Sequence, residues 1–469
     1  MKLKPFILLM MCAFWGLSAQ AQTMTAVCDQ TSTNSITRRY GENIVVYNRN
    51  QDSSVFNVIT VIDGEFADLY TIELDTSVWV NDFEMLGDEL YFCGTHRANI
   101  IGDKKVCIGK ITFESDWQTA NRTVTFYDVP ILCSYADISD ALRIAVCTVG
   151  NVSHIFFVAD GIISANQLPA RGIVELVIPT GSTVIWNAYI STDGVEYFND
   201  VAVTDNYVIT VAKKNGSSGI YMRRFSKPED DRDTSAVIRQ INPYWIADMD
   251  CQPLTDPYMT RTENDKVGIA FYGDHEGDKG LIIESINFAG TPTVTKNQID
   301  VIPNYNINRQ KIKDIRYDGF ANRYLIVQQN YRVLVPANPF SPPAYSLYSG
   351  EVRLYSDVPS STPKIIVKPA SNTLYSIDCY SASVFVTSGK SGNNDNDKLK
   401  FHKNNLTNST ACSTKTIGNT TLLSTGIVGY AISSISPTRP DPLPPVYTTA
   451  IVTVFQDILT FVCPINIIH

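Results

Sequence analysis

One local pattern recurs along most of the chain and constrains its fold more than any other feature. It is clearest over residues 80–113, where an apolar-alternating piece opened by Asn81 and Asp82 precedes a Gly87-Asp88 turn and two strand-like runs. Such alternation between turn residues is typical of antiparallel strands. The pattern returns about every 45 to 65 residues, which indicates a repeated sheet unit rather than unrelated strands.

The repeat predicts seven hairpins, and helical periodicity is nearly absent. Each hairpin combines two β-rich runs with turn residues close by. The paired runs are residues 44–47 with 55–62, 90–93 with 106–113, 142–147 with 154–158, 207–211 with 220–225, 267–272 with 281–288, 324–328 with 352–355, and 384–387 with 399–402.

A short piece opened by a polar residue precedes several of these hairpins. Asp82, Asp200, Asp314 and Asp378 hold comparable positions in it. We therefore expect this piece to be an inner strand and Asp82 to be structural rather than catalytic. A unit of four strands cannot bury both of its faces alone, so neighbouring units must supply the core between them.

In architecture, these four-stranded repeats make the chain resemble the β-propeller superfold over nearly its whole length. The resemblance implies an all-β fold in which residues 22–469 form a single domain of about seven four-stranded blades, closed by N- and C-terminal strands. Eight blades are the alternative, if residues 450–455 and 458–463 form a further hairpin after the proline-rich loop at 436–446. No signature of a particular propeller family is present: no Trp-Asp dipeptide is repeated, and Ser191-Thr192-Asp193-Gly194 fails as an Asp-box because Val195 stands where that pattern needs a glycine.

The first residues predict export. Residues 1–21 contain two lysines, a short apolar core and Ala19-Gln20-Ala21, as expected of a cleaved signal peptide. We therefore expect a periplasmic, cell-surface or extracellular protein. No later run reaches 18 apolar residues, so we expect no membrane-spanning helix.

The net charge of the chain indicates which classes of partner it can bind. The chain has 38 basic and 47 acidic residues, and an acidic surface repels phosphate backbones. We therefore expect no nucleic-acid partner, and a glycan or an envelope or extracellular protein instead. The oligomeric state is not predicted.

Export makes disulfides possible, and two cysteine pairs share a spacing of 14 residues. These pairs, Cys93 with Cys107 and Cys133 with Cys147, are candidate cross-strand bridges, and Cys28 with Cys463 is a candidate clasp between the chain ends. The alternative for each is a small buried apolar side chain.

Four unusual loops are candidates for one binding face, because loops within the central hairpins of a propeller usually project to one side. A glycan or protein ligand would contact them. The long loop 331–349 carries prolines and aromatic rings, and such rings suit a sugar or a peptide, although they could instead fold back over the sheet. The candidate ligand-binding residues are His96 and Arg97, Asp274, His275, Glu276 and Asp278, and Tyr331, Phe340, Tyr345 and Tyr348; the fourth loop is residues 393–397.

Two segments resemble metal-binding loops, and each lacks part of the required pattern. Asp395 and Asp397 alternate as in a calcium loop, but Lys398 stands at the position of the turn glycine and Asn404 at that of the bidentate glutamate. His275 lies among carboxylates, yet no second histidine stands at ligand spacing. We therefore predict no metal and no cofactor.

The sequence thus favours a binding protein over an enzyme. It contains no Gly-x-Ser-x-Gly elbow, His-Glu-x-x-His motif, phosphate loop or Cys-x-x-Cys pair. The first alternative is a propeller-type carbohydrate-active enzyme with two catalytic carboxylates about 5 to 10 Å apart. The second is a structural component of a cell-surface assembly, which would present a large apolar patch.

Overall fold

The structure is a computed structural model, and all secondary structure in its described part is β-strand. Over that part, no helix has the length and apolar character needed to cross a membrane. The described residues are 24–50, 57–62, 68–74, 77–97, 104–113, 122–127, 140–163, 169–178, 185–190, 196–214, 219–227, 244–248, 252–302, 305–334, 344–357, 364–368, 373–381, 384–390, 398–405, 413–417, 421–422, 427–431, 447–452, 454–455 and 460–461.

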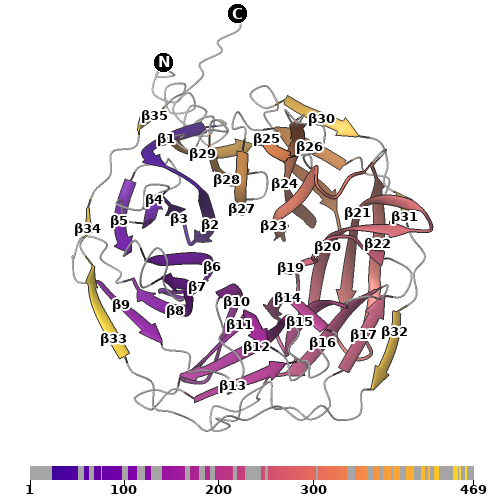
Figure 1. The fold of residues 1–469 in the computed structure, drawn as a ribbon, viewed down its shortest axis with the longest axis horizontal. Coiled ribbons are helices and arrows are strands. Elements are labelled where there is room, and N and C mark those ends of the chain that lie inside the picture. The colour runs from indigo at the N-terminus through magenta and orange to yellow at the C-terminus, as the bar shows by residue number, and fades with distance from the viewer. Residues whose placement is uncertain are drawn as a thin grey trace, which may run out of the picture.

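The strands form antiparallel sections that are arranged radially in a propeller-like manner (Figure 1). The first contains β2 (Asn34–Tyr40), β3 (Asn43–Arg49), β4 (Asn57–Ile62) and β5 (Asp68–Leu74). The next contains β6 (Val78–Leu86), β7 (Glu89–Arg97), β8 (Lys104–Thr112) and β9 (Arg122–Tyr127). It is followed by β10 (Asp140–Val149), β11 (Val152–Ile163), β12 (Pro169–Ile178) and β13 (Ile185–Ile190).

The second half of the chain continues in the same way. One section contains β14 (Glu196–Val203), β15 (Tyr207–Lys214), β16 (Ile220–Ser226) and β17 (Tyr244–Asp248). Another contains β18 (Gln252–Pro253), β19 (Tyr258–Arg261), β20 (Lys266–His275), β21 (Asp278–Asn287) and β22 (Thr293–Val301). The last two are β23 (Gln310–Asp318), β24 (Arg323–Leu334), β25 (Ala344–Ser356) and β26 (Lys364–Lys368), and then β27 (Thr373–Ser381), β28 (Val384–Lys390) and β29 (Lys398–Asn405) with β1 (Met24–Thr31).

All seven predicted hairpins are present as antiparallel pairs. In the third section, however, the predicted pair is the first and second strands, β10 and β11, rather than the second and third. The turns that follow five of the innermost strands share a backbone feature: Gly41, Gly87, Gly150, Asn264 and Asn322 all have a positive φ between 47° and 58°, whereas the turn at Asp205-Asn206 after β14 has none. Glycine and asparagine tolerate this left-handed conformation best, which explains the turn residues of the repeat.

The innermost strands surround the centre of the molecule (Figure 1). They are β2, β6, β10, β14, β19, β23 and β27, and each contacts the next in this order, while β2 also contacts β27. The pieces opened by polar residues are therefore inner strands, as predicted.

Apolar cores lie between neighbouring sections, as predicted. For example, Ile44 and Val46 of β3 pack with Val386 of β28 and Phe401 of β29. Equivalent clusters join each other pair of successive sections. Because each section buries its faces against its neighbours, no section completes a core by itself.

Aspartates of the innermost strands connect neighbouring sections. Asp200 Oδ1 accepts the N–H of Val201 (2.8 Å), and its Oδ2 accepts the N–H of Met259 (2.8 Å) on the next innermost strand. Asp82, Asp314 and Asp378 make the same pair of contacts, to the following residue and to the N–H of Ile144, Ile377 and Arg39, respectively. These carboxylates are therefore structural, as the repeat indicated for Asp82.

Short C-terminal strands lie on the perimeter of the sections (Figure 1). Residues 450–455 and 458–463 do not form the hairpin that an eighth blade requires. Their described parts pair instead with β9, β5 and β1, strands of three different sections. The perimeter strands and their partners are β30 (Ser413–Ile417) with β26, β31 (Thr421–Leu422) with β22, β32 (Ile427–Ala431) with β17, β33 (Tyr447–Val452) with β9, β34 (Val454–Phe455) with β5, and β35 (Thr460–Phe461) with β1. The proline-rich loop 436–446 lies outside the described residues.

The predicted Cys93–Cys107 bridge is wrong. Cys93 pairs with Ile108 and Cys107 with Gly94, so the two thiols point to opposite faces of the sheet. They accordingly belong to different apolar clusters, Cys93 with Tyr91 and Cys107 with Phe92.

Cys147 has no disulfide in the described part of the chain and is buried. It pairs with His154 across the turn at Gly150, and burial raises the pKa of its thiol to about 12. Cys133 and Cys463 lie outside the described residues, as does the side chain of Cys28.

Replacing Asp200 by alanine tests the aspartate bridges. The substitution leaves two buried N–H groups without an acceptor, so we expect it to lower the free energy of unfolding by about 2–4 kcal/mol. Urea denaturation measures this loss. The control is Asp205→Ala, since Asp205 is 48% exposed and pairs with an exposed Arg261; it should cost about 0.5 kcal/mol or less. Equal losses in the two variants would contradict a bridging role for Asp200.

Candidate central site

Two cavities lie between the innermost strands. One, of about 270 Å³, is lined mainly by the N-terminal halves of these strands, and we call it the N-side cavity. The other, of about 290 Å³, is lined mainly by their C-terminal halves, and we call it the C-side cavity. Arg38, Asp82, Arg143, Tyr258 and Asp314 line both cavities and therefore form a layer between them.

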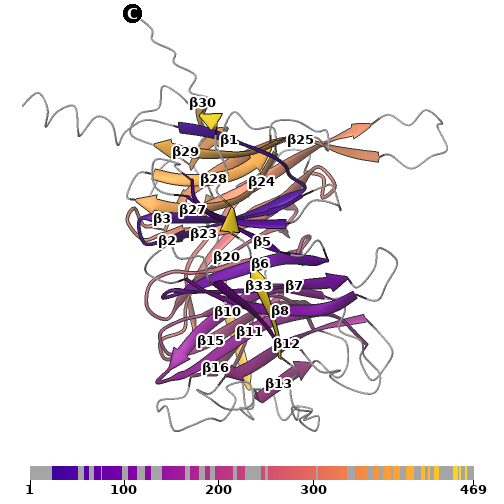
Figure 2. The ribbon, with the colours of Figure 1, turned by 90° about the vertical axis from the view of Figure 1, so that its left-hand side faces the viewer.

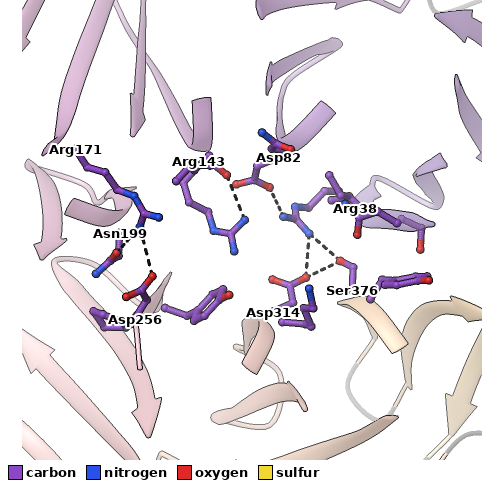
Figure 3. A pocket seen from close by; sticks show the side chains of 17 residues that line it. Arg38, Asp82, Arg143, Arg171, Asn199, Asp256, Asp314 and Ser376 are labelled. Atoms are coloured by element: carbon purple, nitrogen blue, oxygen red, sulfur yellow. Dashed lines mark hydrogen bonds and ion pairs between the residues drawn. The ribbon is translucent and has the colours of Figure 1, made fainter. Parts of the chain in front are cut away.

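One half of this layer is tied together by a buried guanidinium. Arg38 Nη2 lies 2.6 Å from Asp82 Oδ1, and Arg38 Nη1 lies 3.3 Å from Asp314 Oδ2 (Figure 3). Arg38 Nη1 also donates to the hydroxyl of Ser376, 3.2 Å away, which itself donates to Asp314. Together with the backbone N–H groups described above, these contacts occupy the carboxylate oxygens of Asp82 and Asp314.

The other half of the layer, formed by Arg143 and Tyr258, makes fewer hydrogen bonds. Arg143 donates through Nη1 to the carbonyl of Leu142 (3.3 Å), and its guanidinium lies 5.0 Å from the ring of Tyr258. Figure 3 shows this guanidinium pointing into the middle of the N-side cavity. A guanidinium has five N–H donors, so most of those on Arg143 remain available to a molecule in the cavity.

β-bulges direct additional polar side chains into the N-side cavity. The register shifts between Val80 and Asp82, between Phe198 and Asp200, and between Ile312 and Asp314. A bulge re-aims a side chain, and the inserted residues Asn81, Asn199 and Lys313 all line the N-side cavity.

The three bulge residues differ in their bonding. Asn81 Nδ2 donates to the carbonyl of Ala141 on the neighbouring strand (2.8 Å). Asn199 accepts from Arg171 (2.7 Å) through Oδ1, but its buried Nδ2 has no hydrogen-bond partner among the described residues. Lys313 makes no hydrogen bond or ion pair with any described residue, so the cavity contains donors that the described part of the chain does not satisfy.

A second polar cluster closes one side of the N-side cavity. Arg171 lies over the ring of Tyr197, at 4.1 Å, and its Nη1 lies 3.4 Å from Asp256 (Figure 3). The cluster places an amide, a carboxylate and a guanidinium together beside an aromatic ring. These groups are suited to hydrogen-bonding the hydroxyls of a sugar.

Burial shifts the pKa values of several groups around the layer. It raises the pKa of Glu84 to about 7, although Arg316 opposes the shift, and it raises the pKa of Asp200 to about 6. Burial would also raise the pKa of Asp314, but Arg316 and Arg38 hold it below its usual range. Burial, with Arg143 and Lys311, lowers the pKa of Lys313 to about 8.

The sequence-predicted ligand residues lie elsewhere, on three different sections. His96 is half-buried on β7 opposite Val78, and Arg97 is described only as backbone. Asp274, His275 and Asp278 form the end of the β20–β21 hairpin, where Asp274 Oδ1 accepts the N–H of Gly277 (2.9 Å) and the side chain of Glu276 is exposed.

The aromatic loop extends from β24 and β25. The hydroxyl of Tyr331 donates to Gln329 (2.9 Å), and that of Tyr345 accepts from Asn308 (3.5 Å). Phe340 lies outside the described residues, and the side chain of Tyr348 is not described. In Figure 2 the β24–β25 hairpin projects from one side of the molecule, the same side at which β7 ends.

None of the described side chains among these predicted residues lines either cavity. No group of three His, Cys, Asp or Glu side chains in the described part is arranged to hold a metal ion. Asp395 and Asp397 lie outside that part.

The sequence interpretation missed Arg38, Arg143, Tyr258 and Lys313. Of these, only Lys313 had a local signal, because it immediately precedes Asp314 as Asn81 precedes Asp82. The others become neighbours only when distant innermost strands converge.

Comparisons with known proteins show no family. No family model matches the chain, and no curated protein matches it. Among solved structures, a prolyl endopeptidase is 9% identical over 84% of this chain with a TM-score of 0.41, and this chain spans 50% of its length. A GH32 beta-fructofuranosidase of Bombyx mori (9% identity, 88% of this chain, 94% of that chain, TM-score 0.34) and a GH43 protein of a Bacteroides ovatus xyloglucan locus (8%, 85%, 98%, 0.26) are also similar. At these scores the likeness carries no argument about activity.

Glu84 should make stability depend on pH. Because its pKa rises from 4.5 to about 7 on folding, the folded state binds more protons between these values, and stability falls as the pH rises through this window. We expect Glu84→Gln to remove a decrease on the order of 2 kcal/mol between pH 4.5 and 7. Urea denaturation at several pH values, with the exposed Glu276→Gln as control, measures it. Parallel curves for wild type and Glu84→Gln would refute the shifted pKa.

Proposed function

We propose that residues 22–469 form one closed, seven-bladed β-propeller that binds a saccharide in its N-side cavity. Closure is supported by the cyclic contacts of the innermost strands and by the apolar cluster between the first and last sections. The pairing of β1 with β29 supports the predicted closing role of the N-terminal strand.

The observation that carries the binding proposal is the unsatisfied polar lining of the N-side cavity. The Nδ2 of Asn199 is buried without a partner, and a lone buried amide donor costs about 1–3 kcal/mol. A bound acceptor such as a sugar hydroxyl removes this penalty when the amide turns toward the cavity, since Nδ2 itself is shielded from solvent. The cavity is slightly smaller than the roughly 300–1,000 Å³ of common ligand sites, so it suits one terminal sugar residue rather than a long chain segment.

The predicted loops extend this site. Each follows the second strand of its section, and the innermost strands begin on that same side, where the N-side cavity lies. His96, Asp274 and Tyr331 would therefore border the mouth and contact the rest of a glycan. The leader-like residues 1–21 support an exported protein that meets such glycans outside the cytoplasm.

Asn199→Asp tests the binding site with little change in shape. It keeps the oxygen that accepts from Arg171 but replaces the amide donor with an acceptor. We expect saccharide affinity, measured by calorimetry after a glycan-array screen, to fall roughly 10- to 100-fold. The control is Asn287→Asp, because Asn287 lies at the far end of β21 and its Oδ1 accepts from Ala289. A panel in which wild type binds no saccharide would overturn the proposal.

A carbohydrate-active enzyme is the second candidate, and one observation favours it. In the C-side cavity, the pKa of Glu84 is raised to about 7 while that of Asp314 is lowered, and such divergence separates a general acid from an ionised carboxylate.

Hydrolysis of aryl glycosides distinguishes the two candidates. We expect wild type to show no turnover, because Asp314 and Glu84 accept backbone N–H bonds that hold the sections together. The enzyme candidate instead requires turnover that falls at least about 100-fold in Glu84→Gln. Turnover with that loss would replace the binding proposal.

A further inference from the structure

The charged groups around the N-side cavity differ in how fully they are bonded. Two of the acids are saturated: Asp82 accepts from Arg38 and from two backbone N–H groups, and Asp314 accepts from Ser376, Arg38 and two backbone N–H groups. The third, Asp256, is 47% exposed and pairs with Arg171 at 3.4 Å. Two of the bases are not saturated: Arg143 has one described hydrogen bond, and Lys313 has none.

The N-side cavity therefore has more unsatisfied hydrogen-bond donors than acceptors, and a bound molecule must supply the acceptors. A neutral hydroxyl accepts weakly, whereas a carboxylate or sulfate accepts several bonds and compensates a cation. Arg143 and Lys313 both line the N-side cavity, and Arg143 contributes electrostatically to the lowered pKa of the lysine.

In the described part of the chain, no carboxylate forms an ion pair with either cation, although Asp82, Asp200 and Asp314 act electrostatically on Arg143. Arg171, across the cavity, is paired with Asp160 and Asp256, and Arg38 with Asp82 and Asp314. Lys313 is half-buried beside the layer, where water supplies less solvation than at an open surface. An unpaired ammonium in this position is costly unless a ligand compensates it.

We propose that Arg143 and Lys313, with the amide of Asn199, form a subsite for the oxyanion substituent of an acidic saccharide, either a uronate carboxylate or a sulfate ester. This proposal rests on the proposed function, and it names the class of sugar that the N-side cavity selects. Arg143 supplies parallel N–H donors suited to two oxygens of the oxyanion. Lys313 supplies a single compact charge.

Calorimetry with matched saccharides tests the subsite. The probes are a galacturonate trisaccharide, its methyl ester, which has the same rings without charge, and a 6-sulfated galactose oligosaccharide. We expect wild type to bind the acid, the sulfated sugar or both roughly 10- to 100-fold more tightly than the ester. Tighter binding of only one identifies the oxyanion. Equal affinity for acid and ester, or preference for the ester, would overturn the subsite while leaving saccharide binding intact.

Variants of Lys313 assign the preference to this residue. Lys313→Gln should reduce the acid-to-ester affinity ratio to about one, and Lys313→Arg should retain it. Lys266→Gln is the matched control and should bind as wild type does, because Lys266 is also half-buried but pairs with Asn287 at the other end of the β20–β21 hairpin, away from the predicted loop. Melting temperatures of all variants exclude unfolding as the cause. A preference that survives Lys313→Gln would also overturn the assignment.

A simple anion separates this inference from the proposed function. If no saccharide binds, the proposed function fails, and the subsite is tested by thermal shift in sodium acetate and sodium sulfate against sodium chloride at equal ionic strength. Stabilisation of wild type that is absent from Lys313→Gln supports an oxyanion subsite. No specific stabilisation of wild type would refute it.

Discussion

The structure depends on hydrogen bonds between aspartates and backbone N–H groups of neighbouring innermost strands. Each such aspartate holds its own strand through the following N–H and reaches the next innermost strand with its second oxygen. Apolar clusters hold the outer parts of neighbouring sections together without direction, whereas these bonds have defined geometry. The centre of the molecule is therefore built from charged groups whose positions are set by backbone contacts.

This construction explains why the centre contains a polar layer and two cavities instead of an apolar core. The carboxylates need compensation once they are removed from water, and Arg38 supplies it to Asp82 and Asp314 together. The bulge that places each of Asp82, Asp200 and Asp314 also turns the preceding residue toward the N-side cavity. The bulge that the structural aspartate requires therefore also creates an equivalent position beside the cavity in each of these three strands. Asn199 and Lys313 occupy two of these positions and present unsatisfied donors there.

Much of the scaffold could be predicted from sequence, because hairpins and turn glycines are local. The paired runs, the inner-strand aspartates and the cores between neighbouring sections were all correct. Register was not predictable: Cys93 and Cys107 differ by one residue from a facing pair, and one residue reverses the face of a strand. The candidate site was also missed, since Arg38, Arg143 and Tyr258 meet only after strands more than one hundred residues apart converge. The aromatic and acidic loops drew attention because exposed polar or aromatic runs are visible locally, whereas isolated charged residues within strands are not.

Hydrogen–deuterium exchange of the innermost strands tests the central claim most directly, because it reports on the N–H groups that the aspartates bind. If the bridges organise the centre, peptides that contain Arg39, Ile144, Met259 and Ile377 exchange as slowly as the buried middle strands, and Asp200→Asn accelerates exchange at Met259 in particular. Rapid exchange of these four N–H groups in the wild-type protein would contradict the account, since it would mean that the innermost strands are not held by their carboxylates.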